Sequence, residues 1–413
     1  MLPEFSRAPP RYTCKSTEQR RSLGNVVELK NCAGRLQVFM ITVREVAEKD
    51  IIPLAEFLPT GLPFKYTTKK IWLRRFQIWW TQNPAFMSQI LKGWILENDA
   101  KLVGFIGNIP VKFLMCGEIK TAVAAVSWYV DPSIRGLPSL MLFNEYLKQK
   151  NASLFLFNSD NKNLLNILIK NKFKEYFVPR FQKKYFYILN RTKVEYILRE
   201  FLFSGSFPRL NEVSVCMTRL GLLMCAYLYQ KPVGALPEKE YTTSFCTFCD
   251  DAFSRIWEPS LNLCDVTLSR DTKTLNWIYF SSIEPNKRVV IQCRRSPDNS
   301  LAGYMVFDIV RKKTSDGAKM ELMDLCLENH DPQVLASLLA FAIEIGKQYN
   351  AALLEVWADS QETDMFFQRI FTLRMGAQQQ NFFRFPDVPE INSGSMTVCP
   401  SMIAPPRGID HFF

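Results

Sequence analysis

Histidine is almost missing from this chain of 413 residues, which contains only His330 and His411. A histidine base, the commonest catalytic proton acceptor, is therefore excluded from the first three quarters of the sequence. The sequence also lacks the P-loop, the GxSxG nucleophile turn and the HExxH zinc motif. It thus shows none of the signatures of P-loop nucleotide hydrolases, α/β-type serine hydrolases or HExxH metalloproteases.

The cysteines form neither a disulfide framework nor a recognisable zinc site. There are eleven of them, an odd number, scattered along the chain. This pattern is typical of a reducing compartment, where cysteine serves as a small buried hydrophobe. Cys246 and Cys249 have metal-ligand spacing, but neither a second pair nor a nearby histidine completes the four ligands of zinc. We predict no metal and a cytoplasmic location.

No segment of the sequence resembles a secretory signal or a membrane span. Residues Met1 to Gln19 lack an apolar core, so they do not form a signal peptide. The longest apolar stretch, Val213 to Tyr229, is interrupted by Arg219 and is short for a membrane helix. We interpret it as a buried helix, with an interfacial helix and peripheral membrane contact as the alternative.

Positive charge is concentrated in the first half of the chain. Residues 1–200 contain 31 Lys and Arg against 16 Asp and Glu, a balance of +15, and the remainder contains 20 against 24, a balance of −4. A basic half favours a phosphate-rich cofactor, a nucleic acid or an anionic membrane surface, with plain solubility as the alternative.

Residues 162–193 contain interleaved basic and aromatic side chains. This pattern predicts a strand whose aromatic side chains are buried and whose basic side chains face solvent. The alternative is a surface that binds single-stranded nucleic acid.

The pattern of apolar residues predicts an α/β (α+β) protein with two domains. We expect a flexible tail over 1–36, a first domain over 37–200, a helical connector over 201–250, a second domain over 251–388 and a second tail over 389–413. Each domain is expected to be a mixed, twisted sheet flanked by helices.

An internal repeat supports the two domains. Gly104 in "LVGFI" corresponds to Gly303 in "LAGYM", and the strands and helices after each glycine follow at similar spacings. Both sections have the order strand, strand, helix, strand, helix, strand. The two sections share this pattern without obvious sequence identity.

The segment "VDPSIRGLPSLML", residues 130–142, contains the most informative turn. A strand ends at Val130, and a helix begins near Pro138, whose missing N–H costs nothing at a first helical position. Free amides and the positive end of the helix dipole at this point favour a phosphate group, and Arg135 adds a charge-assisted bond. The alternative is a helix start that only packs.

This segment resembles the GNAT superfamily of acyl-CoA-dependent N-acyltransferases, whose "V-x-P-x-x-R-G-x-G-x-G-x-x-L" turn holds the pyrophosphate of acyl-CoA. The strand "LVGFIG" and the segment "NKNLLNILIKNKFKEYF" are also similar to GNAT elements. The segment "FQIWWTQNPAF" is similar to one in GNAT proteins linked to bacterial surface polysaccharides. The resemblance covers residues 38–190 and, more weakly, 270–386.

The chain departs from the family pattern at several glycines. Pro138 and Leu140 stand where the turn usually has glycine, and Lys172 replaces the glycine of a Gly-Phe pair. The second copy has "LENHDPQVLASLL" at the turn, with two acids that repel phosphate, Glu328 and Asp331. We therefore predict that the first copy is the active one and that the second serves as support.

The resemblance implies roles for particular residues of the first copy. The acyl-CoA is expected to contact a set of residues in and after the strand: Ser127, Trp128, Val130, Arg135, Gly136, Leu137, Ser139 and Leu140. Backbone amides near Ser127 and Trp128 would face the thioester carbonyl. Glu118 and Asp131 are the candidate bases, and Tyr176 and Tyr129 the candidate acids.

Three functions are compatible with these features. The first is transfer of an acyl group, such as acetyl, from acyl-CoA to an amine of a small molecule, amino sugar or cell-envelope precursor. The second is an aminoacyl-tRNA-dependent transferase of the kind that builds peptidoglycan bridges, which the basic first half suits. The third is a tandem GNAT-like protein that binds a ligand without catalysis.

Overall fold

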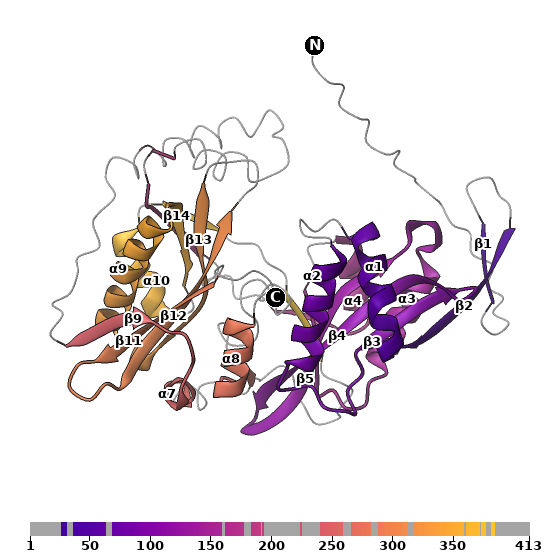
Figure 1. The fold of residues 1–413 in the computed structure, drawn as a ribbon, viewed down its shortest axis with the longest axis horizontal. Helices are drawn as coiled ribbons and strands as arrows, with labels where there is room; N and C mark the ends of the chain where they lie inside the picture. Colours follow the sequence, from indigo (N-terminus) through magenta and orange to yellow (C-terminus); the bar gives the residue numbers. More distant parts are fainter. Residues whose placement is uncertain are drawn as a thin grey trace, which may run out of the picture.

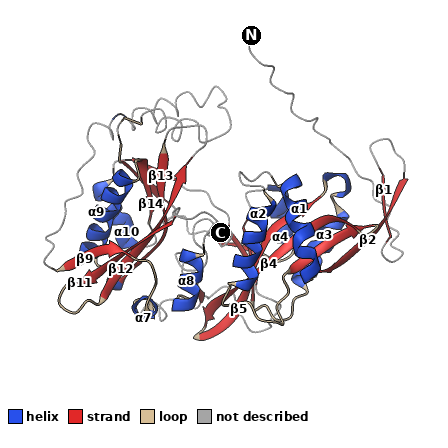
Figure 2. Ribbon diagram, viewed as in Figure 1, coloured by secondary structure: helices blue, strands red, loops and turns tan. Residues whose placement is uncertain are grey.

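The computed structural model describes residues 26–30, 36–62, 68–158, 162–176, 183–190, 192–193, 224, 240–258, 266–281, 288–311, 317–358, 361–371, 373–376 and 381–384. These residues form two mixed sheets, each flanked by helices (Figures 1 and 2). The predicted fold class is thereby confirmed. Most of the predicted connector, including Val213 to Tyr229 apart from residue 224, and the tail 389–413 lie outside the described residues.

The first sheet is built mainly from the first half of the chain. Its strands lie in the order β1 (Val26–Lys30), β2 (Leu36–Glu45), β3 (Gly93–Asn98), β4 (Lys101–Met115), β5 (Glu118–Val130), β6 (Leu154–Asn158), β16 (Asn381–Arg384) and β7 (Lys174–Tyr176). The short strand β10 (Val266–Leu268) also pairs with β4. The pairing is antiparallel except between β5 and β6. Strand β1 belongs to the segment predicted as a tail.

Helices cover both faces of the first sheet. The chain runs through η1 (Glu48–Asp50), α1 (Ile51–Gly61), α2 (Lys69–Phe76), the π-helical η2 (Gln77–Thr81), η3 (Pro132–Ile134), α3 (Leu137–Leu147) and α4 (Lys162–Lys170). Leu54 and Leu58 of α1 belong to one buried cluster with Phe105. Leu142 and Phe143 of α3 belong to another, so α1 and α3 lie on opposite faces.

The second sheet repeats this arrangement. Its order is β15 (Leu373–Gly376), β8 (Lys183–Ile188), β14 (Ala351–Trp357), β13 (Ala318–Leu327), β12 (Leu301–Arg311), β11 (Arg288–Arg295) and β9 (Tyr241–Phe245). Its helices are α7 (Asp251–Arg255), α8 (Thr272–Phe280), η7 (Glu328–His330), α9 (Pro332–Gln348) and α10 (Gln361–Ile370). The parallel pair is β13 and β14, as it is β5 and β6 in the first sheet.

The two sheets exchange a strand. β8 follows the elements of the first sheet in the chain but pairs with β14 and β15 of the second. β16 follows the elements of the second sheet but pairs with β6 and β7 of the first. Each exchanged strand lies between the last two strands of the other half. Neither sheet is therefore complete without a strand from the other half of the chain.

A shared core joins the two halves. Helix α8 lies between the sheets (Figure 1), and its Trp277 belongs to the same buried cluster as Trp79 of the first half and Tyr304 of the second. The indole Nε1 of Trp277 donates to the carbonyl oxygen of Ile78 at 2.8 Å. Within the described residues, no helix combines the length and apolarity needed to cross a bilayer.

Candidate functional site

Strand β5 separates from its parallel neighbour before it ends. It pairs with β4 along its whole length, from Glu118 to Val130. It pairs with β6 only where Ala122 to Ala124 face Leu154 to Leu156. Among the described residues, no strand pairs with this edge of β5 beyond Ala124. Side chains already bond to part of this edge, since the Tyr146 hydroxyl contacts the backbone at Val123 and Ala125. The stretch from Val126 to Tyr129 is left for a ligand that follows the strand.

A β-bulge distorts β5 at the same place. Phe105 pairs with Tyr129 and Gly107 with Val126, so Ser127 and Trp128 together oppose the single residue between them on β4. Ser127 has a φ of 51°, in the left-handed region that a side chain disfavours. Bulges redirect backbone and side-chain groups, and they are frequent beside active sites. The strained residue is one of those predicted to face the thioester.

The turn after β5 is held by its own side chains. The Asp131 carboxylate accepts from the backbone N–H and the hydroxyl of Ser133, at 2.9 and 2.7 Å. These bonds lower the pKa of Asp131. Arg135 donates through Nε to the carbonyl oxygen of Val130 at 2.8 Å, and its guanidinium carbon lies 5.6 Å from the centre of the Tyr129 ring. Arg135 is thereby fixed at the surface beside the start of α3.

The N-terminus of α3 is open. Gly136 precedes it with a φ of 117°, and a Cβ on this residue would meet no atom within 4 Å. The amides of Gly136 and Leu137 have no hydrogen-bond acceptor among the described residues, whereas those of Ser139 and Leu140 donate to the Gly136 carbonyl at 3.1 and 3.3 Å. Two free amides at the positive end of a helix, next to an arginine, form an anion site.

Tyr129 is buried beside this turn. Its ring lies 5.4 Å from that of Phe57 in α1, and a Cβ on Gly61 would collide with its hydroxyl end. The hydroxyl has no hydrogen-bond partner among the described residues, although the residue is only 7% exposed. A phenol with a free O–H at the end of β5 can donate a proton to a leaving group bound along this strand. The partners Phe57 and Gly61 carry no sequence motif that identifies them.

The other predicted residues are spread more widely. The Trp128 ring stacks on Phe143 at 5.0 Å, on the α3 face of the sheet. Glu118 lies at the opposite end of β5 from Asp131, roughly 40 Å away at the usual rise of a strand. Glu118 is exposed and pairs with Lys120, which lowers its pKa. Tyr176 ends β7, where its backbone pairs with Asn381. The predicted binding residues thus lie together at the end of β5 and the start of α3, whereas Glu118, a candidate base, lies far from them.

The N-terminus of α9 in the second half corresponds to that of α3, but carboxylates of the second half already occupy it. Asp331 caps α9 directly by accepting from the N–H of Gln333 at 2.8 Å, and it also accepts from the Tyr241 hydroxyl at 2.9 Å. Glu328 forms an ion pair with Arg295. A carboxylate thus occupies the helix start where the first half offers free amides.

Strand β13 of the second half also has a bulge, at Met323 between the Phe307–Leu322 and Val306–Asp324 pairs. Asp324 accepts a bond of 2.8 Å from Arg270 and a further bond from Tyr279, and all three side chains are buried. No motif in the sequence marks this cluster. Its members fill the space beside the second bulge.

No family model matches the sequence, and no curated protein matches it significantly. Solved structures do match its fold. A GCN5-related N-acetyltransferase from Anabaena variabilis aligns with a TM-score of 0.52 at 8% identity, over 84% of this chain and 73% of the other. An Enterococcus faecalis protein described as a probable N-acyltransferase aligns with a TM-score of 0.53 at 10% identity, over 84% and 73%.

A GCN5-related N-acetyltransferase from Kribbella flavida aligns with a TM-score of 0.51 at 11% identity, over 85% of this chain and 72% of the other. All three alignments extend across both sheets rather than one. The chain therefore has the fold of these proteins, and the predicted resemblance to GNAT proteins is confirmed at the level of fold.

Proposed function

We propose that the chain is an acyltransferase that moves an acyl group from acyl-CoA to an amine, with its active site in the first half. One arrangement carries the proposal: an unpaired edge of β5, bulged at Ser127, leads directly to the open N-terminus of α3. The second half has a carboxylate at its helix start and serves as support.

The donor would lie along β5 with its phosphates at α3. The amides of Gly136 and Leu137 and the guanidinium of Arg135 bind the pyrophosphate, and Ser139 adds a hydroxyl at the first turn. The backbone from Val126 to Tyr129 pairs with the amide groups of the pantetheine arm, as a strand would. Trp128 and Leu140 contribute apolar surface. Because Gly136 has no side chain and no close neighbour, a phosphate can approach its backbone.

The reaction requires few catalytic side chains because the thioester is already activated. The amine attacks the thioester carbonyl, the bulge amides at Ser127 and Trp128 stabilise the oxyanion, and the C–S bond then breaks. Tyr129 gives its proton to the departing thiolate, with Tyr176 as the second candidate acid. Asp131 is the candidate base at this end of β5, although its capping bonds lower its pKa and weaken it in that role.

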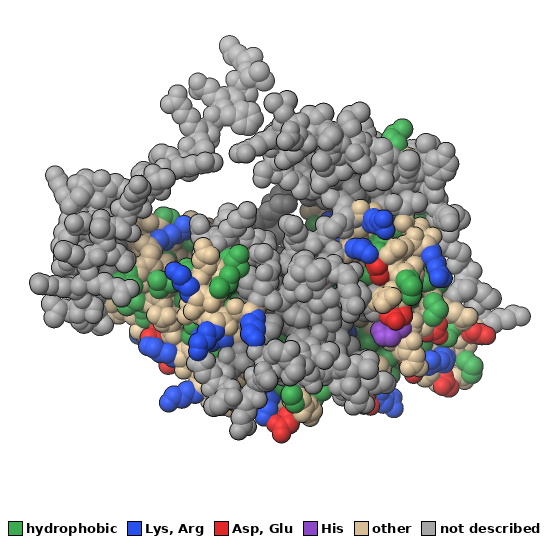
Figure 3. All heavy atoms as spheres, turned by 180° about the vertical axis from the view of Figure 1, so that it is seen from behind, with side chains coloured by type: hydrophobic (Ala, Val, Ile, Leu, Met, Phe, Trp, Pro, Cys, Tyr) green, Lys and Arg blue, Asp and Glu red, His purple; other side chains and the backbone are tan. Residues whose placement is uncertain are grey.

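The acceptor is proposed to be an amine on an amino sugar or cell-envelope precursor, and acetyl is the proposed acyl group. The charge of the first half supports an anionic ligand. On the face seen in Figure 3, Lys and Arg side chains predominate over the described part of the first half, whereas both signs mix over the second. The same charge suits an aminoacyl-tRNA donor, which is the alternative.

Calorimetry with acetyl-CoA on the full chain tests the proposal. We expect binding at or below about 1 mM and a loss of at least about tenfold in affinity for Arg135→Glu and for Ser139→Asp. Lys150→Glu makes the same change of charge on an exposed lysine just beyond the other end of α3 and should bind like the wild type.

The remaining outcomes separate the alternatives. A folded protein that does not bind acetyl-CoA but shifts tRNA in a salt-dependent manner would favour the tRNA-dependent function. Binding without turnover of any amine would indicate a binding protein. Wild-type affinity in both Arg135→Glu and Ser139→Asp would place the donor elsewhere.

A further inference from the structure

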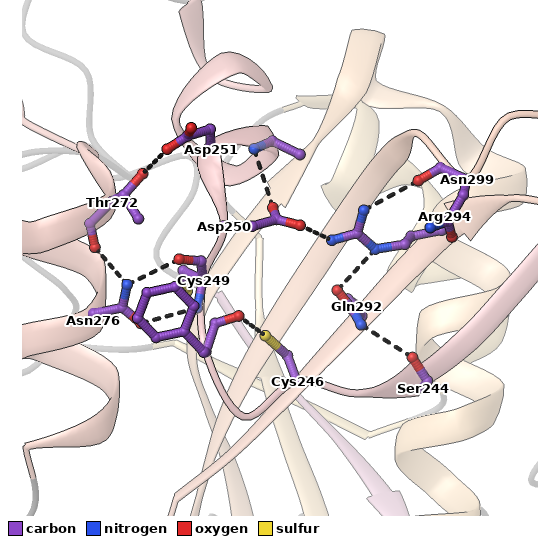
Figure 4. A network of polar contacts seen from close by, with 12 residues as sticks. Ser244, Cys246, Cys249, Asp250, Asp251, Thr272, Asn276, Gln292, Arg294 and Asn299 are labelled. Carbon is purple, nitrogen blue, oxygen red and sulfur yellow. Dashed lines mark hydrogen bonds and ion pairs between the residues drawn. The ribbon is translucent and has the colours of Figure 1, made fainter.

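Cys246 and Cys249 lie together in the turn between β9 and α7 (Figure 4). Both thiols are free, and the Cys246 sulfur lies 3.1 Å from the carbonyl oxygen of Phe248. Cys249 is fully buried, whereas Cys246 is 8% exposed and is followed by the exposed residues Thr247 and Phe248. The turn therefore presents one cysteine near the surface and a second that is fully buried.

The turn is fixed on the side of Cys249. The side chain of Asn276 in α8 accepts from the Cys249 N–H and donates to the Cys249 carbonyl, both at 2.9 Å. The following residue, Asp250, caps α7 and forms an ion pair of 2.7 Å with Arg294. These bonds, drawn in Figure 4, hold the backbone of the turn, and the side chains of Cys246 and Cys249 are hydrogen-bonded to each other.

The two thiols differ in acidity. A hydrogen bond from the Cys249 thiol lowers the pKa of Cys246, against the opposing effect of burial. The same bond and burial raise the pKa of Cys249. Since the thiolate is the reactive form of cysteine, Cys246, the more exposed of the two residues, is also the better nucleophile.

We propose that Cys246 and Cys249 are a redox-active dithiol, in which Cys246 reacts with a hydroperoxide and Cys249 closes an intramolecular disulfide. A hydroperoxide is small enough for a sulfur with so little exposure. The site is separate from the proposed acyl-transfer chemistry, and its place beside α8 puts it next to the helix that joins the two halves.

The reaction balances in two steps. With hydrogen peroxide, the Cys246 thiolate attacks one peroxide oxygen, the O–O bond breaks, and the sulfur becomes a sulfenic acid while the other oxygen leaves as water after protonation. The Cys249 sulfur then attacks the Cys246 sulfur, its proton joins the leaving hydroxyl, and a second water is released. For hydrogen peroxide, two thiols and one peroxide give one disulfide and two waters. A dithiol reductant reverses the change.

Mass spectrometry of the full chain after limited exposure to hydrogen peroxide tests the proposal. Trypsin cleaves after Lys239 and Arg255, so both cysteines lie in one peptide. We expect this peptide to lose two hydrogens, to resist alkylation and to recover with dithiothreitol. In Cys249→Ser, dimedone should label Cys246 as the sulfenic acid, and in Cys246→Ser it should not label Cys249.

Other cysteines of the same chain are the controls. Cys116 is exposed and Cys293 is buried, and burial raises the pKa of Cys293 to about 12. We expect Cys246 to oxidise at least about tenfold faster than either. Oxidation no faster than that of Cys293, or pairing of Cys246 with a cysteine other than Cys249, would overturn the proposal. Circular dichroism of each variant checks that it is folded.

Discussion

Asp131 and Asp331 occupy comparable places after the bulged strand of each half, yet their carboxylates act on different helices. Asp131 caps the short η3, and α3 begins only after Arg135 and Gly136. Asp331 caps α9 itself. A negative charge at a helix start repels a second anion and satisfies the amides that would bind it. The position of one carboxylate thus distinguishes the open helix start from the closed one.

The free hydroxyl of Tyr129 leads to the first prediction. Tyr129→Phe removes the proposed acid without removing the ring that packs on Phe57, so we expect kcat for acetyl transfer to fall by about 10²-fold while acetyl-CoA affinity stays unchanged. Steady-state kinetics and calorimetry measure the two quantities. Tyr187→Phe removes the same atom from the core of the second half and should leave kcat unaltered. A wild-type kcat in Tyr129→Phe would exclude the tyrosine as the acid.

Glu355 makes stability depend on pH. Burial alone would raise its pKa, but Lys319 and Lys184 outweigh that effect and hold it at about 2, against an ordinary value of 4.5. The folded chain therefore binds fewer protons than the unfolded chain between these values. The carboxylate contributes about 3 kcal/mol above the unfolded pKa, and this contribution is lost as the pH falls from 4.5 toward 2.

Urea unfolding at pH 7, 5 and 3 measures this effect. We expect Glu355→Gln to be less stable than the wild type at pH 7 and the difference to shrink as the pH falls to 3. Glu344→Gln alters an exposed ion pair with Lys347. Its free energy of unfolding should change with pH in the same way as that of the wild type. A difference in the free energy of unfolding between Glu355→Gln and the wild type that stays constant with pH would show that the lowered pKa of Glu355 is not its cause.

At the scale of elements, the starts of α3 and α9 should respond differently to mutation. Asp331→Ala removes a cap and the partner of the Tyr241 hydroxyl, so we expect the free energy of unfolding to fall by about 1 kcal/mol. Acetyl-CoA affinity should not change, because the donor site is assigned to α3. Chemical denaturation and calorimetry test both parts. Loss of acetyl-CoA binding in this variant would assign the donor to the second half.

The segment from Lys69 to Trp80 shows how packing modifies a helical pattern. Its apolar spacing is helical, and α2 does begin at Lys69, but from Gln77 the chain widens into the π-helical η2. Phe76 and Trp80 stack at 4.7 Å within a cluster of buried aromatic rings. Local periodicity indicates a helix, whereas the fit of large rings to the sheet decides its pitch.

For the whole molecule, the strand exchange predicts that neither half folds alone. A fragment ending at residue 239 lacks β16, which lies between β6 and β7, and the complementary fragment lacks β8, which lies between β14 and β15. We expect each fragment to be unfolded or aggregated by circular dichroism and the two to form a folded complex when co-expressed. Two fragments that each unfold cooperatively on their own would contradict this expectation.

The sequence by itself determined the order of the repeated elements in each half. The repeat that starts at Gly104 and Gly303 predicted β4, β5, α3, β6, α4 and β7 and their counterparts in the second half, because such patterns are local. It also indicated the turn at residues 130–142. The domain boundaries and the roles of the site residues remain predictions.

Only the tertiary structure decided which strands pair. A strand's pattern of apolar residues does not say which sheet the strand completes, so the exchange of β8 and β16 was not foreseen. The free hydroxyl of Tyr129 likewise depends on residues distant in the chain. The pairing of strands, the bulge in β5 and the absence of a partner for a buried hydroxyl all depend on contacts between residues far apart in the chain. Local sequence patterns carry no information about such contacts.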